Sequence, residues 1–463
     1  MLVIKRLKRG WGRGASVRAS GEYTRGRARL ERRGGGRRRP CGALSGWNPP
    51  SRVDIRRSFA SCSPVPHTHD NTRTGPRSVL FTAFEPSGDE HAAVVIRELR
   101  RRDPSLVIHA WGGERMERAG AVVVERTGLA ATMGMPGLAK ILEHRRINRR
   151  VESWVKSNRP CLHVAVDSPA ANFPICKITR AHGASVVHLV APQMWAWGSW
   201  RVRKLRRLTD HVLCLLPFEP DWFEARGVRA TFVGHPLLDH ELDEEAIEAA
   251  VHGFPEGSPK VAIMPGSRPS EITANFPMML ETFRRIRERQ PGAACVVAAT
   301  TERVRERLRE IANEWGGWPE GMDVVVAGVD SATRWCDLAI VVSGTVTLHV
   351  ARQHKPMVVI YRVNKFTYAL VGRWIIAADH IALPNLVAGR RIVPEIAPKT
   401  NDDPAPIVEQ AMRLLDDADA RRAMRDDLAD TMRRFEGRSA ATGAADAIEQ
   451  TLRELRPALV GAT

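Results

Sequence analysis

The chain has 463 residues, enough for two or three domains with large hydrophobic cores. Its formal net charge is +18, but residues 1–76 hold 18 Lys and Arg against 4 Asp and Glu. The rest of the chain therefore carries only about +4 and is not a generally basic nucleic-acid-binding surface. Seven scattered cysteines without a CxxC pair exclude an obvious disulfide framework or zinc site and favour reduced, cytoplasmic thiols.

Residues 1–76 are rich in Arg and Gly, and we expect them to be disordered because they offer too little apolar area to bury. Two interpretations remain open: an arm that binds nucleic acid or anionic lipid, or a dispensable leader that results from a misplaced start. No apolar run reaches the roughly 18 to 20 residues that span a bilayer. Residues 2–4 are too short for the apolar region of a signal peptide.

From residue 78, apolar runs alternate with turns and helical patterns. The predicted strands are 78–83, 106–111, 122–124, 161–166, 186–190, 212–216 and 230–233, with a helix at about 92–101. Repeated strand–turn–helix units predict a parallel sheet. Gly234-His235-Pro236 is typical of a hinge, and residues 240–257 are expected to form an acidic, helical connection.

A second series follows this connection. Its predicted strands are 261–264, 294–299, 323–327, 338–342 and 357–361, with helices near 275–290 and 301–315 and a charged helical region after about 404. The pattern predicts an α/β protein with two Rossmann-like domains facing a cleft and helices at the C-terminal end. The expected boundaries are 77–239, 240–403 and 404–463.

The stretch Pro265-Gly266-Ser267-Arg268 follows the first strand of this second series. The carboxyl ends of parallel strands are where open α/β sheets bind ligands. Small residues, a hydroxyl group, backbone N–H groups and one guanidinium suit phosphate oxygens. The stretch therefore indicates a phosphate site, although an ordinary strand-to-helix loop has the same composition.

Several short motifs occur in a fixed order. They are Glu85–Asp89, Gly112-Gly113 with Met116, Met133-Gly134, Asp167 with 168–173, 192–197, 216–219, 232–237, 265–268 with Glu271-Ile272, 343–345, 356–359 followed by Tyr361-Arg362, and 383–386. As an ordered set, covering about residues 77–455, they resemble the lipid-A-disaccharide synthase family. The resemblance implies a GT-B fold and inversion at the anomeric carbon, without a metal or other cofactor. It also implies transfer of diacylglucosamine from its UDP donor to the 6-hydroxyl of 2,3-diacylglucosamine 1-phosphate (lipid X), releasing UDP.

This chemistry needs a base for the attacking hydroxyl. Asp167 ends a buried predicted strand and is our candidate, with Glu85, Asp89 and His91 as competitors. An aspartate before Ser-Pro can instead cap a turn. The predicted acceptor or sugar side comprises Glu85, Ser87, Gly88 and Asp89, where glycine permits close approach of the backbone.

The leaving diphosphate also needs positive charge, for which Arg268 is the first candidate. The predicted UDP-binding set comprises Ser267, Arg268, Glu271, Ser343, Gly344, Thr345, His349 and Asn385. Three alternatives stay open: a surface ion pair between Arg268 and Glu271, a Glu271 that orients Arg268, and an asparagine at 385 that serves only a turn.

Two positions depart from the family pattern. Phe84 stands where family members usually carry glycine, and His349 stands where the resemblance places a ribose-binding glutamate. A neutral imidazole accepts one hydrogen bond and cannot hold two hydroxyls as a carboxylate does. A divergent sugar-nucleotide transferase or epimerase, or a non-catalytic sugar-nucleotide or lipid-binding protein, is therefore the alternative function.

The resemblance also implies contact with a membrane. Met135, Leu138, Ile141 and Leu142 recur near helical spacing and precede the basic residues Arg145, Arg146, Arg149 and Arg150. This pattern is typical of an interfacial segment that admits acyl chains, and a buried core helix is the alternative. Trp195 and Trp197 are expected in the core, and contact with acyl chains or sugar is the alternative. The predicted setting is the inner leaflet of a Gram-negative-type bacterium, with a possible homodimer and no nucleic acid.

Overall fold

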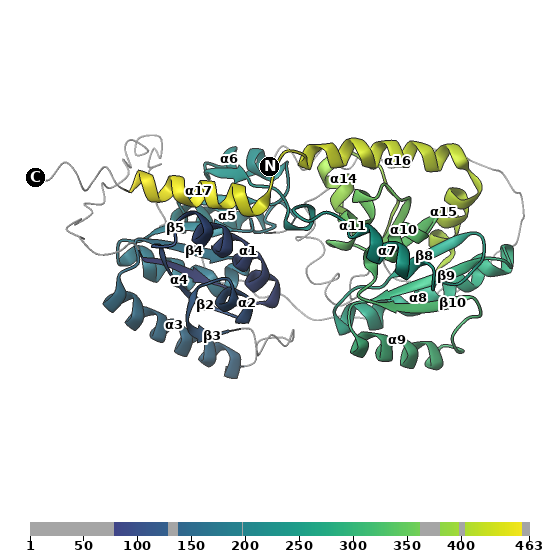
Figure 1. The fold of residues 1–463 in the computed structure, drawn as a ribbon, viewed down its shortest axis with the longest axis horizontal. Helices are drawn as coiled ribbons and strands as arrows, with labels where there is room; N and C mark the ends of the chain where they lie inside the picture. The colour runs from purple at the N-terminus through teal and green to yellow at the C-terminus, as the bar shows by residue number, and fades with distance from the viewer. Residues whose placement is uncertain (1–77, 128–137, 197, 362–379, 398–402, 456–463) are drawn as a thin grey trace, which may run out of the picture. The chain divides into compact units, whose positions relative to one another are not determined.

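In the computed structural model, the described residues are 78–127, 138–196, 198–361, 380–397 and 403–455. They form two parallel sheets with helices packed on them (Figure 1). The predicted α/β class with two Rossmann-like units is confirmed. The basic arm, residues 1–76, lies outside the described residues.

The first sheet has seven strands in the order β3-β2-β1-β4-β5-β6-β7, and all neighbouring strands are parallel. The strands are β1 Ser78–Thr82, β2 Val107–Gly112, β3 Val122–Arg126, β4 Leu162–Val166, β5 Ser185–Leu189, β6 His211–Cys214 and β7 Ala230–Phe232. The central strands β1, β4 and β5 are buried along almost their whole length because helices cover both of their faces, and they are apolar except for a few residues such as Thr82, His163 and His188.

Helices of the first half divide between these two faces. They are α1 Pro86–Arg102, α2 Glu114–Arg118, α3 Leu138–Asn158, α4 Pro169–Ala181, α5 Val202–Leu208 and α6 Glu219–Glu224. Ile96 and Leu99 of α1 pack with one set of inward strand side chains. Ile175 of α4 and Leu205 of α5 lie in separate clusters that cover the opposite face.

The second sheet has the order β10-β9-β8-β11-β12-β13, again with parallel neighbours. Its strands are β8 Lys260–Met264, β9 Ala294–Ala299, β10 Met322–Val326, β11 Leu338–Val342, β12 Met357–Ile360 and β13 Glu395–Ile396. Its helices are α7 Glu244–Val251, α8 Pro269–Arg289, α9 Glu302–Glu314, α10 Val329–Trp335, α11 Val346–Arg352 and α14 Leu383–Ala388.

The last three described helices are shared between the two sheets. α15 (Ala405–Asp416) contacts β11 and β12, and α16 (Ala418–Met432) contacts α11. α17 (Ala440–Glu454) instead packs on α1, so Ile448 and Leu452 complete the core of the first sheet (Figure 1). The expected C-terminal helices are present, but they complete both cores.

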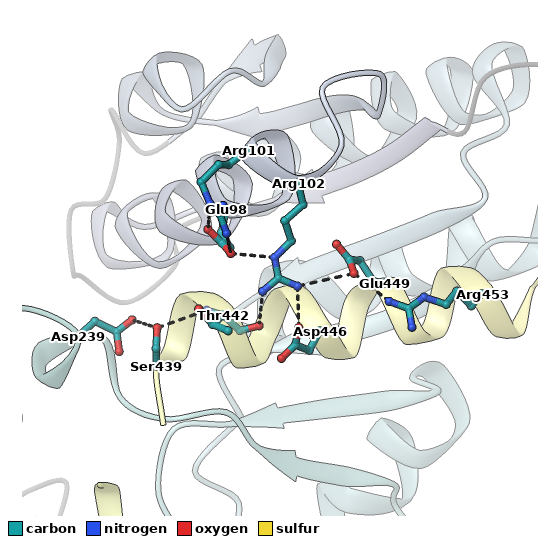
Figure 2. Close-up of polar contacts among 9 residues, drawn as sticks. All are labelled: Glu98, Arg101, Arg102, Asp239, Ser439, Thr442, Asp446, Glu449 and Arg453. Atoms are coloured by element: carbon teal, nitrogen blue, oxygen red, sulfur yellow. Dashed lines mark hydrogen bonds and ion pairs between the residues drawn. The ribbon is translucent and has the colours of Figure 1, made fainter. Parts of the chain in front are cut away.

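Polar contacts join α17 to α1 and to the connection between the two sheets (Figure 2). The guanidinium of Arg102 on α1 binds Glu98 at 2.7 Å and Asp446 at 2.6 Å. Asp239, in the connection between the sheets, accepts the backbone N–H groups of Ala440 and Ala441 at 2.8 and 3.0 Å. These bonds satisfy donors at the helix N-terminus that have no partner within the helix.

The strand orders define one topological switch point in each sheet. In the first sheet, successive connections run in opposite directions from β1 and β4; in the second, from β8 and β11. Ligands of open α/β sheets bind outside the carboxyl ends of strands at such points. The predicted Asp167 directly follows β4 and Arg268 ends the loop between β8 and α8, so each belongs to a switch point.

Candidate functional site

Asp167 stands in a strained turn between β4 and α4. Asp167 and Ser168 have φ values of 49° and 36°, in the left-handed region that non-glycine residues rarely adopt. Val190, after the neighbouring β5, has φ 66°. Backbone strain gathered at the carboxyl edge of a sheet is typical of a functional site.

A buried amide holds this turn in place. Asn172 on α4 donates to the carbonyl oxygens of Val166 and Asp167 at 2.9 and 2.8 Å, and its own oxygen accepts from Thr82 at 2.6 Å. His163 lies 2.8 Å from the Thr82 hydroxyl, and burial lowers the pKa of its imidazole to about 3. The neutral, buried network thus supports the Asp167 backbone from inside the sheet.

Burial raises the pKa of the Asp167 carboxyl; the Ser168 N–H opposes this shift, and the nearby Glu85 adds to it. The positive charge of Arg268 opposes the shift as well. Glu85 accepts a 2.8 Å hydrogen bond from the Ser168 hydroxyl. Burial lowers the pKa of His91, whose Nδ1 has no hydrogen-bond partner among the described residues. The side chains therefore provide a carboxylate with raised proton affinity beside a neutral imidazole.

Helix α1 begins at Pro86, earlier than the expected start near residue 92. Ser87 and Gly88 are consequently in its first turn, and a Cβ on Gly88 would lie 3.3 Å from Ala83 Cβ, closer than an ordinary van der Waals contact, so glycine allows α1 to begin close to the end of β1. The Asp89 carboxylate accepts the N–H groups of Gly113 and Arg115 at 2.7 and 3.1 Å. Asp89 thus caps α2, and its direct contact with sugar stays a prediction.

The loop after β8 has the geometry of a tight turn. Gly266 has φ 107°, and a Cβ there would lie 2.9 Å from Glu271 Oε2. Arg268 immediately precedes the 21-residue α8, and its Nη1 donates to Glu271 Oε1 at 2.8 Å. The Arg268 side chain is 54% exposed, so the pair lies in solvent and contributes little stability. Both alternatives for Glu271, a surface partner or an orienting residue, are compatible with this contact.

The loop after β11 meets the same switch point. Ser343 donates to the carbonyl oxygen of Ile381 at 2.6 Å, and Gly344 has open space around its α-carbon. His349 Nδ1 lies 3.0 Å from Asp330 Oδ1. Burial alone would raise the pKa of the Asp330 carboxyl, but the hydrogen bond with His349 and the nearby charge of Arg352 lower it. Since a carboxylate only accepts, His349 Nδ1 carries the proton and Nε2 is left as an acceptor.

Asn385 is fully buried and its amide is completely engaged. It donates to the Val393 carbonyl and Glu395 carboxylate, and accepts from the N–H groups of Ile392 and Val393, over 2.7 to 2.9 Å. These contacts support the alternative that Asn385 organises a turn. Its predicted hydrogen bond to a sugar or phosphate would require those bonds to break.

The predicted acyl segment is only partly described. Met135 lies outside the described residues, and Leu138, Ile141 and Leu142 lie on α3 without a described side-chain environment. Trp195 is buried as expected, whereas Trp197 lies outside the described residues. Among the described helices, none combines the length and apolarity needed to cross a bilayer. No set of three or more His, Cys, Asp or Glu in the described ranges is arranged to hold a metal ion.

Two residues that shape these loops lie inside the motifs quoted above, but sequence analysis assigns them no role. Asn172 clamps the Asp167 turn, and an asparagine inside a helix, where it is usually unfavourable, was the available signal. Glu219 is buried, accepts the Trp195 indole N–H at 2.9 Å and the Leu216 N–H at 3.0 Å, and has a pKa raised by burial to about 7. It joins the loops that follow β5 and β6.

Comparisons with known proteins agree with the fold and the motifs. The family model described as lipid-A-disaccharide synthetase matches residues 79–449. A lipid-A-disaccharide synthase from Geobacter sulfurreducens is 35% identical over 75% of this chain and 90% of its own length. One from Myxococcus xanthus is 33% identical over 83% of this chain and 99% of its own.

Solved structures share the architecture at low identity. A UDP-GlcNAc 2-epimerase from Neisseria meningitidis, bound to UDP-GlcNAc, has a TM-score of 0.51 at 11% identity and covers 82% of this chain and 100% of its own. The glycotransferase of kitacinnamycin has a TM-score of 0.52 at 17% identity, covering 81% and 99%. Both likenesses support the GT-B fold alone.

Proposed function

The chain belongs to the lipid-A-disaccharide synthase family, and we propose that it joins UDP-2,3-diacylglucosamine to 2,3-diacylglucosamine 1-phosphate with Asp167 and Arg268 as its reacting side chains. It is a glycosyltransferase of lipid A biosynthesis. The observation that carries the proposed roles is the position of Asp167 and Arg268 at the switch points of the two sheets.

Asp167 is the proposed general base. The acceptor 6-hydroxyl attacks the anomeric carbon of the donor, the bond from that carbon to the UDP phosphate breaks, and the hydroxyl proton passes to the Asp167 carboxylate. A raised pKa suits this step because the carboxylate is then a stronger proton acceptor. Asn172 fixes the backbone of the base, and Glu85 and Ser168 form the polar surface beside it.

Arg268 is the proposed stabiliser of the leaving UDP diphosphate. Its exposed guanidinium is free to approach a ligand, and the following α8 directs the positive end of a long helix dipole at the same loop. Glu271, whose carboxylate accepts the 2.8 Å hydrogen bond from Arg268 Nη1, is the proposed orienting residue for the guanidinium. Ser267, Ser343, Gly344 and Thr345 add the hydroxyl and backbone groups of the proposed diphosphate site.

His349 is the proposed ribose contact. Its Nδ1–H is committed to Asp330, so its Nε2 accepts one ribose hydroxyl. The second ribose hydroxyl, which a glutamate at this position would also bind, is left to another group or to water. This arrangement predicts weaker UDP binding than a carboxylate would give, without a change of donor.

The proposed setting is the inner leaflet of a bacterial membrane, because both substrates carry acyl chains. The relatives reported above are bacterial proteins. The segment with Met135, Leu138, Ile141 and Leu142 is the proposed entry for acyl chains, and a homodimer is part of the proposal.

The test is the release of UDP by the purified full-length chain from UDP-2,3-diacylglucosamine, with and without lipid X in detergent. We expect release that depends on lipid X and the appearance of a diacylated disaccharide. Turnover of unacylated UDP-GlcNAc would indicate an epimerase-like or divergent transferase activity. Tight UDP binding without turnover, also after His349→Glu, would indicate a non-catalytic binding protein.

A further inference from the structure

A basic surface with an exposed tryptophan begins where the loop after β5 ends. Trp200, in the short 3-10 helix Ser199–Arg201, is 65% exposed. Helix α5 follows directly and presents four exposed cations, Arg203, Lys204, Arg206 and Arg207, while Leu205 anchors it in the core. We call these five exposed residues the α5 surface.

The cations of the α5 surface are not neutralised by neighbouring acids. Residues 190–209 contain no Asp or Glu, and within the described ranges none of the four cations forms an ion pair. Lys204 lies 5.1 Å from the ring centroid of Phe173, and Arg206 reaches only a backbone carbonyl at 3.5 Å. The nearby carboxylate of Asp210 is occupied by Arg180 at 2.6 Å.

This charge is not explained by folding. Four exposed cations within five residues repel one another, which weakens an isolated helix. An exposed indole contributes no buried apolar area to the stability of the fold. Other exposed arginines of this chain are often paired, as in Arg150 with Glu125 and Arg229 with Glu454. The α5 surface therefore has the composition of a surface that faces an anionic, partly apolar partner.

The topology places the α5 surface at the edge of the sheet where Asp167 stands. β4 and β5 are parallel neighbours, so their carboxyl ends lie at one edge. Asp167 follows β4, and the loop that leads to Trp200 follows β5. Helices α3, α4 and α5 cover one face of the sheet in succession and each begins after a strand, hence at this edge.

We propose that the α5 surface docks the protein onto an anionic phospholipid bilayer, with Trp200 at the interface and the four cations over the headgroups. Tryptophan is suited to the interface because its ring is apolar and its indole N–H is polar. Lysines and arginines near an anionic leaflet are attracted to it. Docking here would bring the Asp167 edge toward lipid substrates; that consequence rests on the proposed function, whereas the docking itself does not.

The test uses the full-length chain and vesicles of equal parts phosphatidylglycerol and phosphatidylcholine, compared with phosphatidylcholine alone. The basic residues 1–76 can bind such vesicles by themselves, so the decisive signals are local. We expect the anionic vesicles to slow hydrogen exchange of residues 199–208. We also expect brominated lipid to quench a tryptophan signal that is present in the parent chain and missing in Trp200→Phe.

A charge variant gives the second measurement. Arg203→Gln with Arg207→Gln should weaken partitioning into the anionic vesicles by up to about 30-fold, at roughly fivefold per lost cation. The matched control is Arg303→Gln with Arg309→Gln, which removes two exposed cations from α9. The control should bind vesicles like the parent chain, and added salt should weaken the binding of the parent chain.

The proposal is overturned if vesicles bind but residues 199–208 exchange unchanged and Trp200→Phe loses no quenching, since the arm would then carry the binding. It is equally overturned if an RNA oligonucleotide protects residues 199–208 and vesicles do not. Transfer activity with substrates in detergent should be the same in the Arg203 and Arg207 variant as in the parent. If neither the parent chain nor this variant has transfer activity, the proposed function is rejected, whereas the docking is judged by the vesicle measurements alone.

Discussion

The two switch points of this molecule differ in how far they are prepared for their task. At the end of β4, Asp167 stands in a strained turn that Asn172 and a buried network hold from below. In the loop after β8, Arg268 is exposed, and among the described residues its side chain is bound only to Glu271. The turn of Asp167, which we call the acid side, is preorganised by the fold. The loop of Arg268, which we call the cation side, holds its guanidinium by one solvent-exposed ion pair.

This difference follows from the chemistry that each side must perform. A base needs a raised proton affinity before the substrate arrives, and burial provides it at the cost of strain. A diphosphate brings its own charges, so its partner cation must stay accessible and does not need to be buried. We therefore expect substitutions of Asp167 to change the proton transfer and its pH dependence, and substitutions of Arg268 to slow the departure of UDP without changing that pH dependence.

Replacing the base should have the largest effect. Asp167→Asn keeps the shape of the turn but removes the proton acceptor, and kcat/KM should fall by about 10²- to 10⁴-fold. In the parent chain the rate should rise with pH as the carboxyl ionises, and the raised pKa moves this rise to higher pH than an ordinary aspartate gives. The variant should lose this rise. Asp221→Asn, at an exposed position on α6, is the control. An unchanged pH–rate profile in Asp167→Asn would transfer the role to Glu85 or His91.

Removing the cation should have the next largest effect. Arg268→Ala should lower the rate of UDP release by about 10²- to 10³-fold, because it deletes a charge that stabilises the leaving group. Glu271→Gln retains an oxygen acceptor for the guanidinium and should cost less than about tenfold. Both rates are measured with saturating lipid X. If Arg268→Ala is as active as the parent, the contact with Glu271 is only a surface ion pair.

The buried Glu219 should make the stability of the acid side depend on pH. Its pKa is about 7 in the fold and 4.5 as the reference value. The protonated Glu219 therefore contributes roughly 3 kcal/mol to the free energy of unfolding. This contribution is complete below about pH 4.5 and is lost as the pH rises through 7. Denaturant unfolding of the parent chain and Glu219→Gln from pH 5 to 8 checks this. The buried histidines are present in both proteins, so the difference between their free energies of unfolding at each pH reports on Glu219 alone. A difference that stays constant with pH contradicts the prediction.

The smallest effect is expected at the ribose contact. His349→Glu alone should weaken UDP binding about tenfold or less, because the new carboxylate would meet Asp330 at the 3.0 Å contact that His349 now makes. Adding Asp330→Asn should remove the repulsion and restore or improve the affinity. Calorimetric titration with UDP of both single variants and the double variant forms a mutant cycle. Additive effects would show that His349 and Asp330 do not act together.

Much of the fold could be predicted from the sequence because most of its central strands are short, largely apolar runs, and several are followed directly by Ser, Pro or Asp. The same local pattern located Asp167 directly after β4 and Arg268 in the loop after β8. The early start of α1 also had a local signal, since Pro86 suits the first position of a helix. Strand–turn–helix patterns therefore carried the architecture and the two loops at its switch points.

The remaining features depend on contacts between residues far apart in the chain. Asn385 resembled a ligand contact, yet its amide is used by residues 392–395, which only the fold brings to it. The clamp of Asn172 on the Asp167 turn requires the left-handed backbone that no sequence pattern announces. Nor could periodicity assign α17 to the first sheet, because an amphipathic helix fits any complementary apolar face.

Helix α17 also has a consequence for how the protein is made. Its Ala444, Ile448 and Leu452 cover apolar side chains of the first sheet, although residues 440–454 are synthesised after both sheets. During translation, the face of the first sheet that α17 covers stays open while the whole second sheet emerges from the ribosome. The first half can complete its core only when the last helix returns to it, so a chain broken off before residue 440 exposes an apolar face in a region made long before the break.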